Sequence, residues 1–210
     1  MKFFDRFDKV FCINLDRRKD RMINFQSQVE KYDLGSFERV SAVDGRTLDI
    51  KSIKTKLLPG ELGLVLTNIN IISESIKNSY HQILILEDDC YFTDEIKNID
   101  SYFNELPYDW DMLYMGGNHN THMGVTPPVV INEKVCKLHT TYSTHLVGIK
   151  NSIFNETIKK LNLLSEPLDL SYVKLQKDRN VYSFYPAIAK QIVDFSDIQN
   201  KKTDYNWLIK

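Results

Sequence analysis

Short apolar runs alternate along this chain with segments in which apolar residues recur every three or four positions. Residues 10–13 and 83–86 are continuous apolar runs with the length of a strand that is covered on both faces. Helical spacing over residues 22–29 and, more strongly, over 62–76 predicts helices between these strands. Strands that alternate with helices in this way form sheets flanked by helices. The alternation therefore predicts an α/β fold with a mostly parallel central sheet.

The rest of the chain continues this alternation, apart from one long polar loop at residues 118–132. A loop of this length in a compact domain is usually functional or mobile. The further predicted elements are strands at 37–43 and 112–115, paired strands within 135–149, a helix over 96–103 capped by Thr93, a helix over 151–164, and a short helix after Pro167.

Composition restricts the classes of function. The chain has 27 Lys and Arg against 28 Asp and Glu, so a protein that binds nucleic acid through its phosphates is not expected. Neither the apolar segment of a signal peptide nor a transmembrane segment is visible, which predicts a cytoplasmic protein, free or peripheral to a membrane. With 42% apolar residues, the 210 residues can bury the core of one domain, residues 1–210. Three cysteines are expected to be buried and unreactive: Cys12, Cys90 and Cys136.

Three consecutive carboxylates, Glu87-Asp88-Asp89, follow the apolar run at 83–86. Neighbouring carboxylates at the end of a buried strand repel one another, and burial raises the cost of their charge. Ligands of open α/β sheets bind at the carboxyl ends of strands, so a cation is expected there. Mn²⁺ or Mg²⁺, held by one or two carboxylates and by phosphate oxygens, would meet this requirement. The alternative is a solvated acidic turn.

Two other charged features have both a functional and a structural interpretation. Residues 16–21, Asp-Arg-Arg-Lys-Asp-Arg, follow the first strand, where arginines can clamp a diphosphate. A charged helix start with internal ion pairs is at least as common. Asp169 stands before an apolar helix, either as a general base for an attacking hydroxyl or as the N-cap of that helix.

Seven motifs, in order along the chain, resemble those of glycosyltransferase family 25, the family of lipooligosaccharide and procollagen galactosyltransferases. Each motif is weak by itself, but together they span almost the whole chain, from about residue 9 to residue 198. The motifs are VFCINLDRRKDR at 10–21, VSAVDG at 40–45, GELG at 60–63, ILEDD at 85–89, PLD at 167–169, PAIAKQ at 186–191 and SDI at 196–198.

The resemblance implies a GT-A fold, a single Rossmann-like domain that binds a nucleotide sugar. About residues 1–117 would bind the donor, and about residues 118–210 would form the acceptor and catalytic half. The implied reaction is inverting transfer of galactose or glucose from a UDP-sugar to a hydroxyl of a glycan, a lipooligosaccharide or a glycoprotein, with Mn²⁺ or Mg²⁺ as cofactor. By position, the implied site residues are Asp89 and Glu87 for the metal, Asn14, Arg17, Arg21, Asp44, Glu87 and Asp88 for the nucleotide and cofactor, and Asp169 as base.

Two segments depart from the family pattern. Leu64 and Thr67-Asn68 stand where the family has Cys and Ser-His, and Thr144-His145-Leu146-Val147 replaces the family's TxAY. These departures affect the acceptor side, where we also expect the loop at 118–132 to contact the acceptor. They support a second hypothesis, a glycosyltransferase-like domain that binds a nucleotide or glycan without catalysis. A third, a metal phosphohydrolase, is less favoured because no nucleophile or second metal cluster accompanies the triplet.

Overall fold

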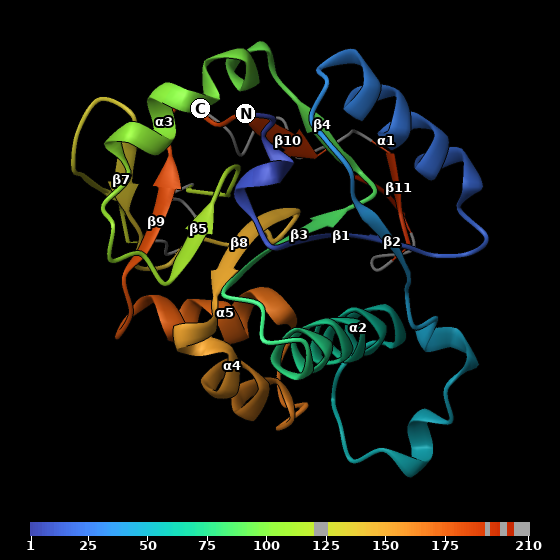
Figure 1. The fold of residues 1–210 in the computed structure, drawn as a ribbon. Helices are drawn as coiled ribbons and strands as arrows, with labels where there is room; N and C mark the ends of the chain where they lie inside the picture. Colours follow the sequence, from blue (N-terminus) through green and yellow to red (C-terminus); the bar gives the residue numbers. More distant parts are fainter. Residues whose placement is uncertain (120–125, 192–193, 198–200, 204–210) are drawn as a thin grey trace.

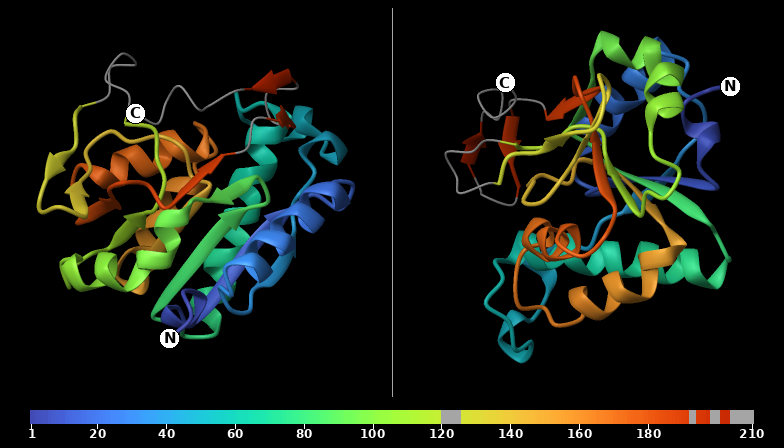
Figure 2. Two further views of the ribbon diagram at one scale, coloured as in Figure 1. Left: turned by 90° about the horizontal axis from the view of Figure 1, so that it is seen from above. Right: turned by 90° about the vertical axis from the view of Figure 1, so that its left-hand side faces the viewer.

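The computed structural model describes residues 1–119, 126–191, 194–197 and 201–203, which form a mixed sheet with helices on both faces (Figures 1 and 2). The strand order in the eight-stranded sheet is β2-β1-β3-β8-β5-β9-β7-β6. Its strands are β1 (Lys9–Asn14), β2 (Glu38–Ser41), β3 (Gln82–Glu87), β5 (Met112–Tyr114), β6 (Val129–Val130), β7 (Val135–Lys137), β8 (Leu146–Lys150) and β9 (Val181–Phe184).

Most strands of this sheet run in one direction, which confirms the predicted α/β fold. β1 is parallel to β2 and β3, and β5 is parallel to β9. β8 lies antiparallel between β3 and β5, and β7 is antiparallel to β9. Two small antiparallel pairs are also described, β4 (Cys90–Phe92) with β10 (Ala189–Gln191), and β11 (Asp194–Ser196) with β12 (Lys201–Thr203).

Helices cover the two faces of the sheet unequally, as Figure 1 shows. α1 (Lys19–Lys31) and α3 (Ile99–Glu105) pack on one face, and α2 (Pro59–Lys77), α4 (Phe154–Leu161) and α5 (Leu168–Gln176) on the other. Successive side chains of β1 and β3 alternate between the two resulting cores. Both faces are therefore apolar, which is why these strands have continuous apolar runs. Short 3₁₀ helices lie at Phe4–Arg6, Gly45–Thr47, Ile50–Ser52, Asp94–Asn98 and Asn151–Ile153.

Several sequence predictions are confirmed. The α1 residues Met22, Phe25 and Val29 are all buried, and the longest predicted helix is α2. The three cysteines are buried and unpaired. Among the residues described, no helix has the length and apolar character needed to cross a bilayer.

Three details of the prediction are wrong. The strands predicted as a pair within 135–149 do not pair, because β7 joins β9 and β6, while β8 lies between β3 and β5. The residues of β8 are apolar on both faces, which suits a central position. Thr93 is the N-cap residue of this segment, which begins as a 3₁₀ turn, but its side chain makes no capping hydrogen bond; its hydroxyl donates to the Ala187 carbonyl oxygen at 3.1 Å. The helix predicted over 151–164 also starts as 3₁₀ and ends as α4 at Leu161.

Two glycines allow the segment after β2 to lie directly against the start of α2. A Cβ at Gly45 would lie 1.6 Å from the Pro59 carbonyl oxygen, and one at Gly63 would lie 2.3 Å from the Val43 carbonyl oxygen. Thr67 completes the contact, because its hydroxyl accepts a hydrogen bond from the Val43 N–H and donates to the Gly63 carbonyl. This packing fixes the position of Asp44, and it gives the departure at Thr67 a structural role.

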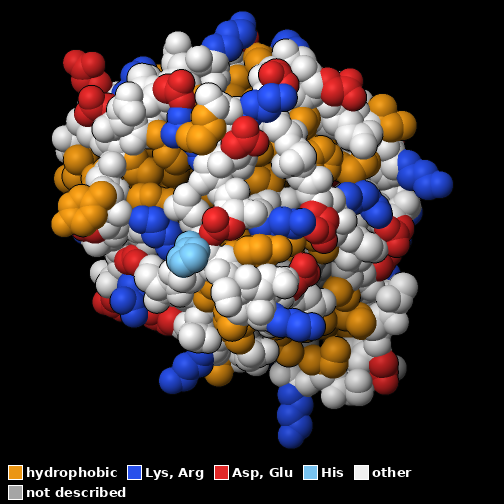
Figure 3. Space-filling model, viewed as in Figure 1, with side chains coloured by type: hydrophobic (Ala, Val, Ile, Leu, Met, Phe, Trp, Pro, Cys, Tyr) orange, Lys and Arg blue, Asp and Glu red, His pale blue; other side chains and the backbone are white. Residues whose placement is uncertain are grey.

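Figure 3 shows that basic and acidic side chains are interspersed on the face of the molecule seen in Figure 1. This distribution agrees with the balance of 27 basic and 28 acidic residues. On this face, charge is balanced overall, so charged side chains can act in function only as local clusters.

Candidate functional site

The carboxyl ends of β1 and β3 bring together two residues that are 74 positions apart. Asn14, the last residue of β1, is 2% exposed, and its amide nitrogen donates to Asp88 Oδ2 at 2.6 Å and to the Arg18 carbonyl oxygen at 2.9 Å. Its amide oxygen accepts a hydrogen bond from Arg39 Nε at 2.8 Å. Asn14 thus uses both ends of its amide to fix the loop after β1 against the carboxylate triplet.

Arg21 reaches the same triplet from the first turn of α1. Its Nη1 lies 3.1 Å from Asp88 Oδ1 and 3.5 Å from Asp89 Oδ2. Both oxygens of Asp88 are therefore engaged, one by Asn14 and one by Arg21. Burial raises the pKa of Asp88 above its ordinary value, although Arg21 and Asn14 both oppose the shift. The arrangement makes Asp88 a carboxylate that holds the site together.

The carboxylate oxygens of Asp89 and Glu87 have fewer hydrogen-bond partners than those of Asp88. Asp89 Oδ1 is buried and has no hydrogen-bond partner among the described residues. Glu87 Oε1 accepts a hydrogen bond from the Thr144 hydroxyl at 2.9 Å. Burial raises the pKa of both Glu87 and Asp89; the charge of Asp88 adds to both shifts, and that of Asp89 adds to the shift of Glu87. A buried carboxylate oxygen without a partner, beside a second carboxylate, is a position where a cation would be stabilised.

The donor set fits a hard divalent cation that is shared with a ligand. In the described part of the chain, no group of three or more His, Cys, Asp or Glu side chains is arranged to hold a metal by itself. Mg²⁺ and Mn²⁺ are commonly bound through one or two carboxylates, with phosphate oxygens and water filling the remaining positions. Asp89 and Glu87 could supply those carboxylates.

A second charged cluster lies beside the first. Arg17 forms an ion pair with Asp44 and contacts Asp197 Oδ1 at 2.7 Å, while Arg18 Nη1 contacts Asp197 Oδ2 at 2.7 Å. Arg18 also pairs with Asp20 at 2.9 Å. The sequence predicted Arg17 and Asp44 as site residues and included Arg18 among the arginines that can clamp a diphosphate, but it assigned no individual role to Asp197. The SDI motif was the signal that could have identified Asp197.

Asp169 lies in the first turn of α5. The N-cap of α5 is Pro167, so the interpretation of Asp169 as N-cap is wrong, and its Oδ1 accepts a hydrogen bond from the Leu170 N–H at 2.9 Å. No hydrogen bond or ion pair between described residues joins it to the carboxylate triplet. Burial raises its pKa, and the charges of Glu61 and Glu166 act in the same direction.

Two groups of buried polar side chains involve residues of α5. Gln176 on α5 donates to Tyr114 Oη at 3.2 Å and exchanges two hydrogen bonds with the Thr141 backbone, both 2.7 Å long. Tyr172 donates to Asn68 Oδ1 at 3.3 Å, so the second polar departure in α2 is also satisfied inside the protein. The sequence did not predict this network, because its members look like ordinary core and loop residues.

The segment before β8 also reaches this region. His145 is 1% exposed, its backbone carbonyl accepts a hydrogen bond from the Glu87 N–H, and its side chain lies beside Gly116. Burial lowers the pKa of His145 to about 4, so its imidazole is neutral near pH 7. The altered segment Thr144-His145 therefore contacts Glu87 directly.

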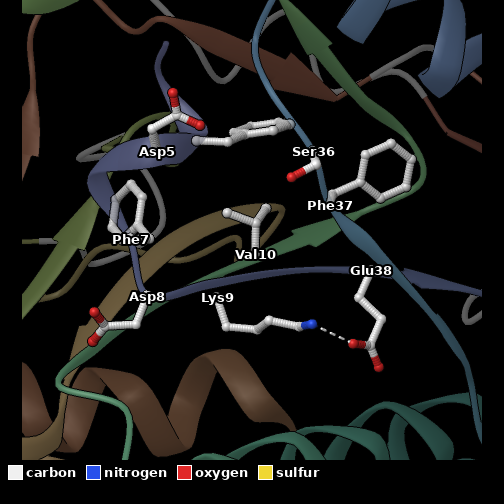
Figure 4. Close-up of a pocket in the computed structure, with 9 residues that line it drawn as sticks. Asp5, Phe7, Asp8, Lys9, Val10, Ser36, Phe37 and Glu38 are labelled. Atoms are coloured by element: carbon white, nitrogen blue, oxygen red, sulfur yellow. Dashed lines mark ion pairs between the residues drawn. The ribbon is translucent and has the colours of Figure 1, made fainter. Parts of the chain in front are cut away.

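Two cavities flank the two ends of β1. One, of about 450 Å³, opens beside the site and is lined by Asn14, Asp16, Lys19, Met22, Ile23 and Arg39. Its size lies in the range of about 300–1,000 Å³ that is typical of ligand pockets. The other, of about 170 Å³, lies at the start of β1, where Lys9 Nζ is 2.6 Å from Glu38 Oε2. Figure 4 shows this ion pair beside the other lining residues. It is at the opposite end of the strand from Asn14.

Of the predicted acceptor loop at 118–132, residues 120–125 lie outside the described residues. The described remainder includes β6 and an isolated bridge between Asn118 and Tyr142.

Comparison with known proteins agrees with the motifs. The sequence profile of "Glycosyltransferase family 25 (LPS biosynthesis protein)" matches residues 7–164. Procollagen galactosyltransferase 1 of Danio rerio is 27% identical over 80% of this chain, and inactive glycosyltransferase 25 family member 3 of Mus musculus is 24% identical over 86%. The chain spans about a third of the length of these relatives, 32% and 34% respectively.

A solved structure supports the fold. The crystal structure of A197 from STIV superimposes with a TM-score of 0.50 over 93% of both chains, at 12% sequence identity. At that identity the similarity concerns the fold alone. The family is shown by the profile match over residues 7–164, in agreement with the ordered motifs: the chain belongs to glycosyltransferase family 25.

Proposed function

We propose that this protein is a metal-dependent, inverting glycosyltransferase that moves galactose or glucose from a UDP-sugar to a hydroxyl of a glycan or glycoconjugate. The observation that carries the proposal is the unpartnered, buried Oδ1 of Asp89, which lies beside Arg21 where β1 and β3 end. Family membership and the names of the galactosyltransferase relatives support the choice of reaction.

The charges of the site explain why a metal would be required. Arg17, Arg18 and Arg21 already contact five aspartates in the described part of the chain. A diphosphate would add further negative charge to a region where carboxylates outnumber arginines. A divalent cation would neutralise charge on the departing UDP, which is the chemistry that it supplies when bound.

The residues of the chain have separate roles in this proposal. Asp89 and Glu87 would hold the metal, while Asn14 and Arg21 keep Asp88 in place and Thr144 orients Glu87. The cavity beside Asn14 is large enough for the nucleoside part of a donor.

Asp169 would accept the proton of the acceptor hydroxyl. A carboxylate whose pKa is raised by burial is a stronger base than an exposed one, and proton transfer to a positioned base typically contributes about 10²–10⁴-fold to a rate. In an inverting reaction this base acts on the face of the sugar opposite to the leaving UDP.

The direct test is release of UDP, and transfer of the labelled sugar, from UDP-galactose and UDP-glucose with Mn²⁺. Asp89→Ala is expected to abolish both, and EDTA should have the same effect on the wild type. Asp33→Asn is the matched control, because Asp33 is 78% exposed and pairs with Lys2. Normal turnover by Asp89→Ala, or by the wild type in excess EDTA, would contradict the proposal.

The second candidate is a domain that binds a nucleotide sugar without transferring it. Asp169 has no hydrogen bond to the triplet in the described structure, and some relatives bear the name "inactive glycosyltransferase 25 family member 3". A rise in melting temperature with UDP and Mn²⁺, combined with no turnover of either UDP-sugar toward any acceptor or water, would favour this candidate.

A further inference from the structure

Asp197 occupies a position that suits a phosphate group. Its two carboxylate oxygens contact two different arginines, Oδ1 with Arg17 Nη2 and Oδ2 with Arg18 Nη1, both at 2.7 Å. The Asp197 side chain is only 16% exposed, and it lies 179 and 180 residues along the chain from these partners. Asp197 therefore links the C-terminal part of the chain to the loop that follows β1 by two ion pairs.

The two arginines are adjacent to the proposed metal position. Arg18 directly precedes α1, whose Arg21 contacts Asp88 and Asp89, and the Arg18 carbonyl accepts a hydrogen bond from Asn14. Paired guanidinium groups bind carboxylates and phosphates through the same charge-assisted geometry. The carboxylate of Asp197 therefore takes up guanidinium donors that could instead bind one phosphate of a diphosphate.

We propose that Arg17 and Arg18 form the phosphate-binding pair for the donor, and that Asp197 is an internal competitor which occupies this pair until a nucleoside diphosphate displaces it. The inference rests on the proposed function, because it concerns the donor of that reaction. It assigns a role to the SDI motif, and it adds Arg18 and Asp197 to the residues that determine donor affinity.

Displacement has two measurable consequences. The apparent dissociation constant of a ligand equals its intrinsic value divided by the fraction of protein in which the site is free. If Asp197 occupies the pair about 90% of the time, its removal would tighten binding about tenfold, which equals about 1.4 kcal/mol. In addition, Asp197 directly follows β11, which pairs with β12, so its release should loosen this hairpin.

The first experiment measures the affinity of UDP, with Mn²⁺ present, by calorimetry for the wild type and for Asp197→Asn. We expect binding about tenfold tighter in the variant. Asp20→Asn is the matched control. Asp20 also pairs with Arg18, but its side chain is 61% exposed, and it is Asp197 that contacts Arg17. It should change the affinity less than twofold. Uridine, which lacks phosphate, should bind both variants and the wild type alike.

The second experiment uses the wild type alone and so does not depend on how a variant folds. Amide hydrogen exchange of residues 194–197 and 201–203 is expected to become faster when UDP and Mn²⁺ are added. Unchanged or slower exchange there, or equal or weaker UDP binding by Asp197→Asn, would overturn the inference while leaving the proposed function intact. If the wild type does not bind UDP with Mn²⁺ at all, the proposed function fails first and this inference fails with it.

Discussion

Replacing Asp89 by Asn should stabilise the metal-free protein while removing the response to Mn²⁺. Burial, opposed by Arg21 but reinforced by Asp88, raises the pKa of Asp89 from 3.8 to about 6. At neutral pH, this difference corresponds to an upper limit of about 3 kcal/mol by which the ionised carboxylate destabilises the fold. The amide of Asn carries no charge but keeps the shape of the side chain and one acceptor oxygen.

The gain in stability from Asp89→Asn should be smaller than this upper limit. The charge of Asp89 raises the pKa of Glu87, so its removal also changes the ionisation of Glu87, and Arg21 loses one of its carboxylate partners in the variant. We therefore expect Asp89→Asn to be more stable than the wild type by about 1–2 kcal/mol, equivalent to about 2–8 °C in melting temperature for a chain of this size.

The pH dependence follows from the sign of the shift. A carboxyl whose pKa is raised in the folded state contributes stability below its unfolded value, here 3.8, and loses it as the pH rises through about 6. The difference in unfolding free energy between Asp89→Asn and the wild type should therefore be absent near pH 4 and should reach its full size above pH 7.

Urea unfolding in EDTA at several pH values measures this difference, with Asp33→Asn as the exposed control. Added Mn²⁺ should then stabilise the wild type and not Asp89→Asn. A variant that is equally stable or less stable than the wild type above pH 7 without metal would refute the reasoning.

Three other substitutions test separate parts of the site. His145→Gln should resist acid better than the wild type, because burial lowers the pKa of His145 from 6.5 to about 4. The stability that depends on neutral His145 is complete above pH 6.5 and is lost as the pH falls toward 4. By pH 5 the wild type should have lost about 2 kcal/mol of unfolding free energy relative to the variant, as measured by urea titration. Thr144→Val leaves Glu87 Oε1 without its hydrogen bond and should slow Mn²⁺-dependent UDP release about tenfold, whereas Thr144→Ser should restore it. Asp169→Asn should reduce sugar transfer by about 10²–10⁴-fold with unchanged UDP affinity in calorimetry, and transfer at the wild-type rate would remove Asp169 from the mechanism.

Local patterns predicted much of the fold. The apolar runs of β1 and β3 and the spacing of Met22, Phe25 and Val29 are features of single segments, and the structure confirms them. Strand order is not local. The sequence of residues 135–150 alone does not predict that β8 lies between β3 and β5 while β7 pairs with β9. The strand order depends on how all the strands pack together in the core.

The same distinction holds for the site. Glu87-Asp88-Asp89 and the arginines after β1 were visible because each cluster is continuous in sequence. The contact of Asn14 with Asp88 joins residues 74 positions apart, and that of Thr144 with Glu87 joins residues 57 apart. A hydroxyl or an amide has no sequence pattern of its own, so these partners emerge only when the strands are placed.

The antiparallel strand β8 interlocks the two halves of the chain. Because β8 runs against its neighbours, it starts at the edge where β3 ends, and Thr144 and His145 are thereby delivered to the triplet. β8 belongs to the second half of the sequence, yet it separates β3 from β5, which both belong to the first. A cut near residue 117 would therefore leave each fragment with an interrupted sheet. Exchange of donor and acceptor specificities between relatives would have to be made by grafting loops, since the halves cannot be swapped as blocks.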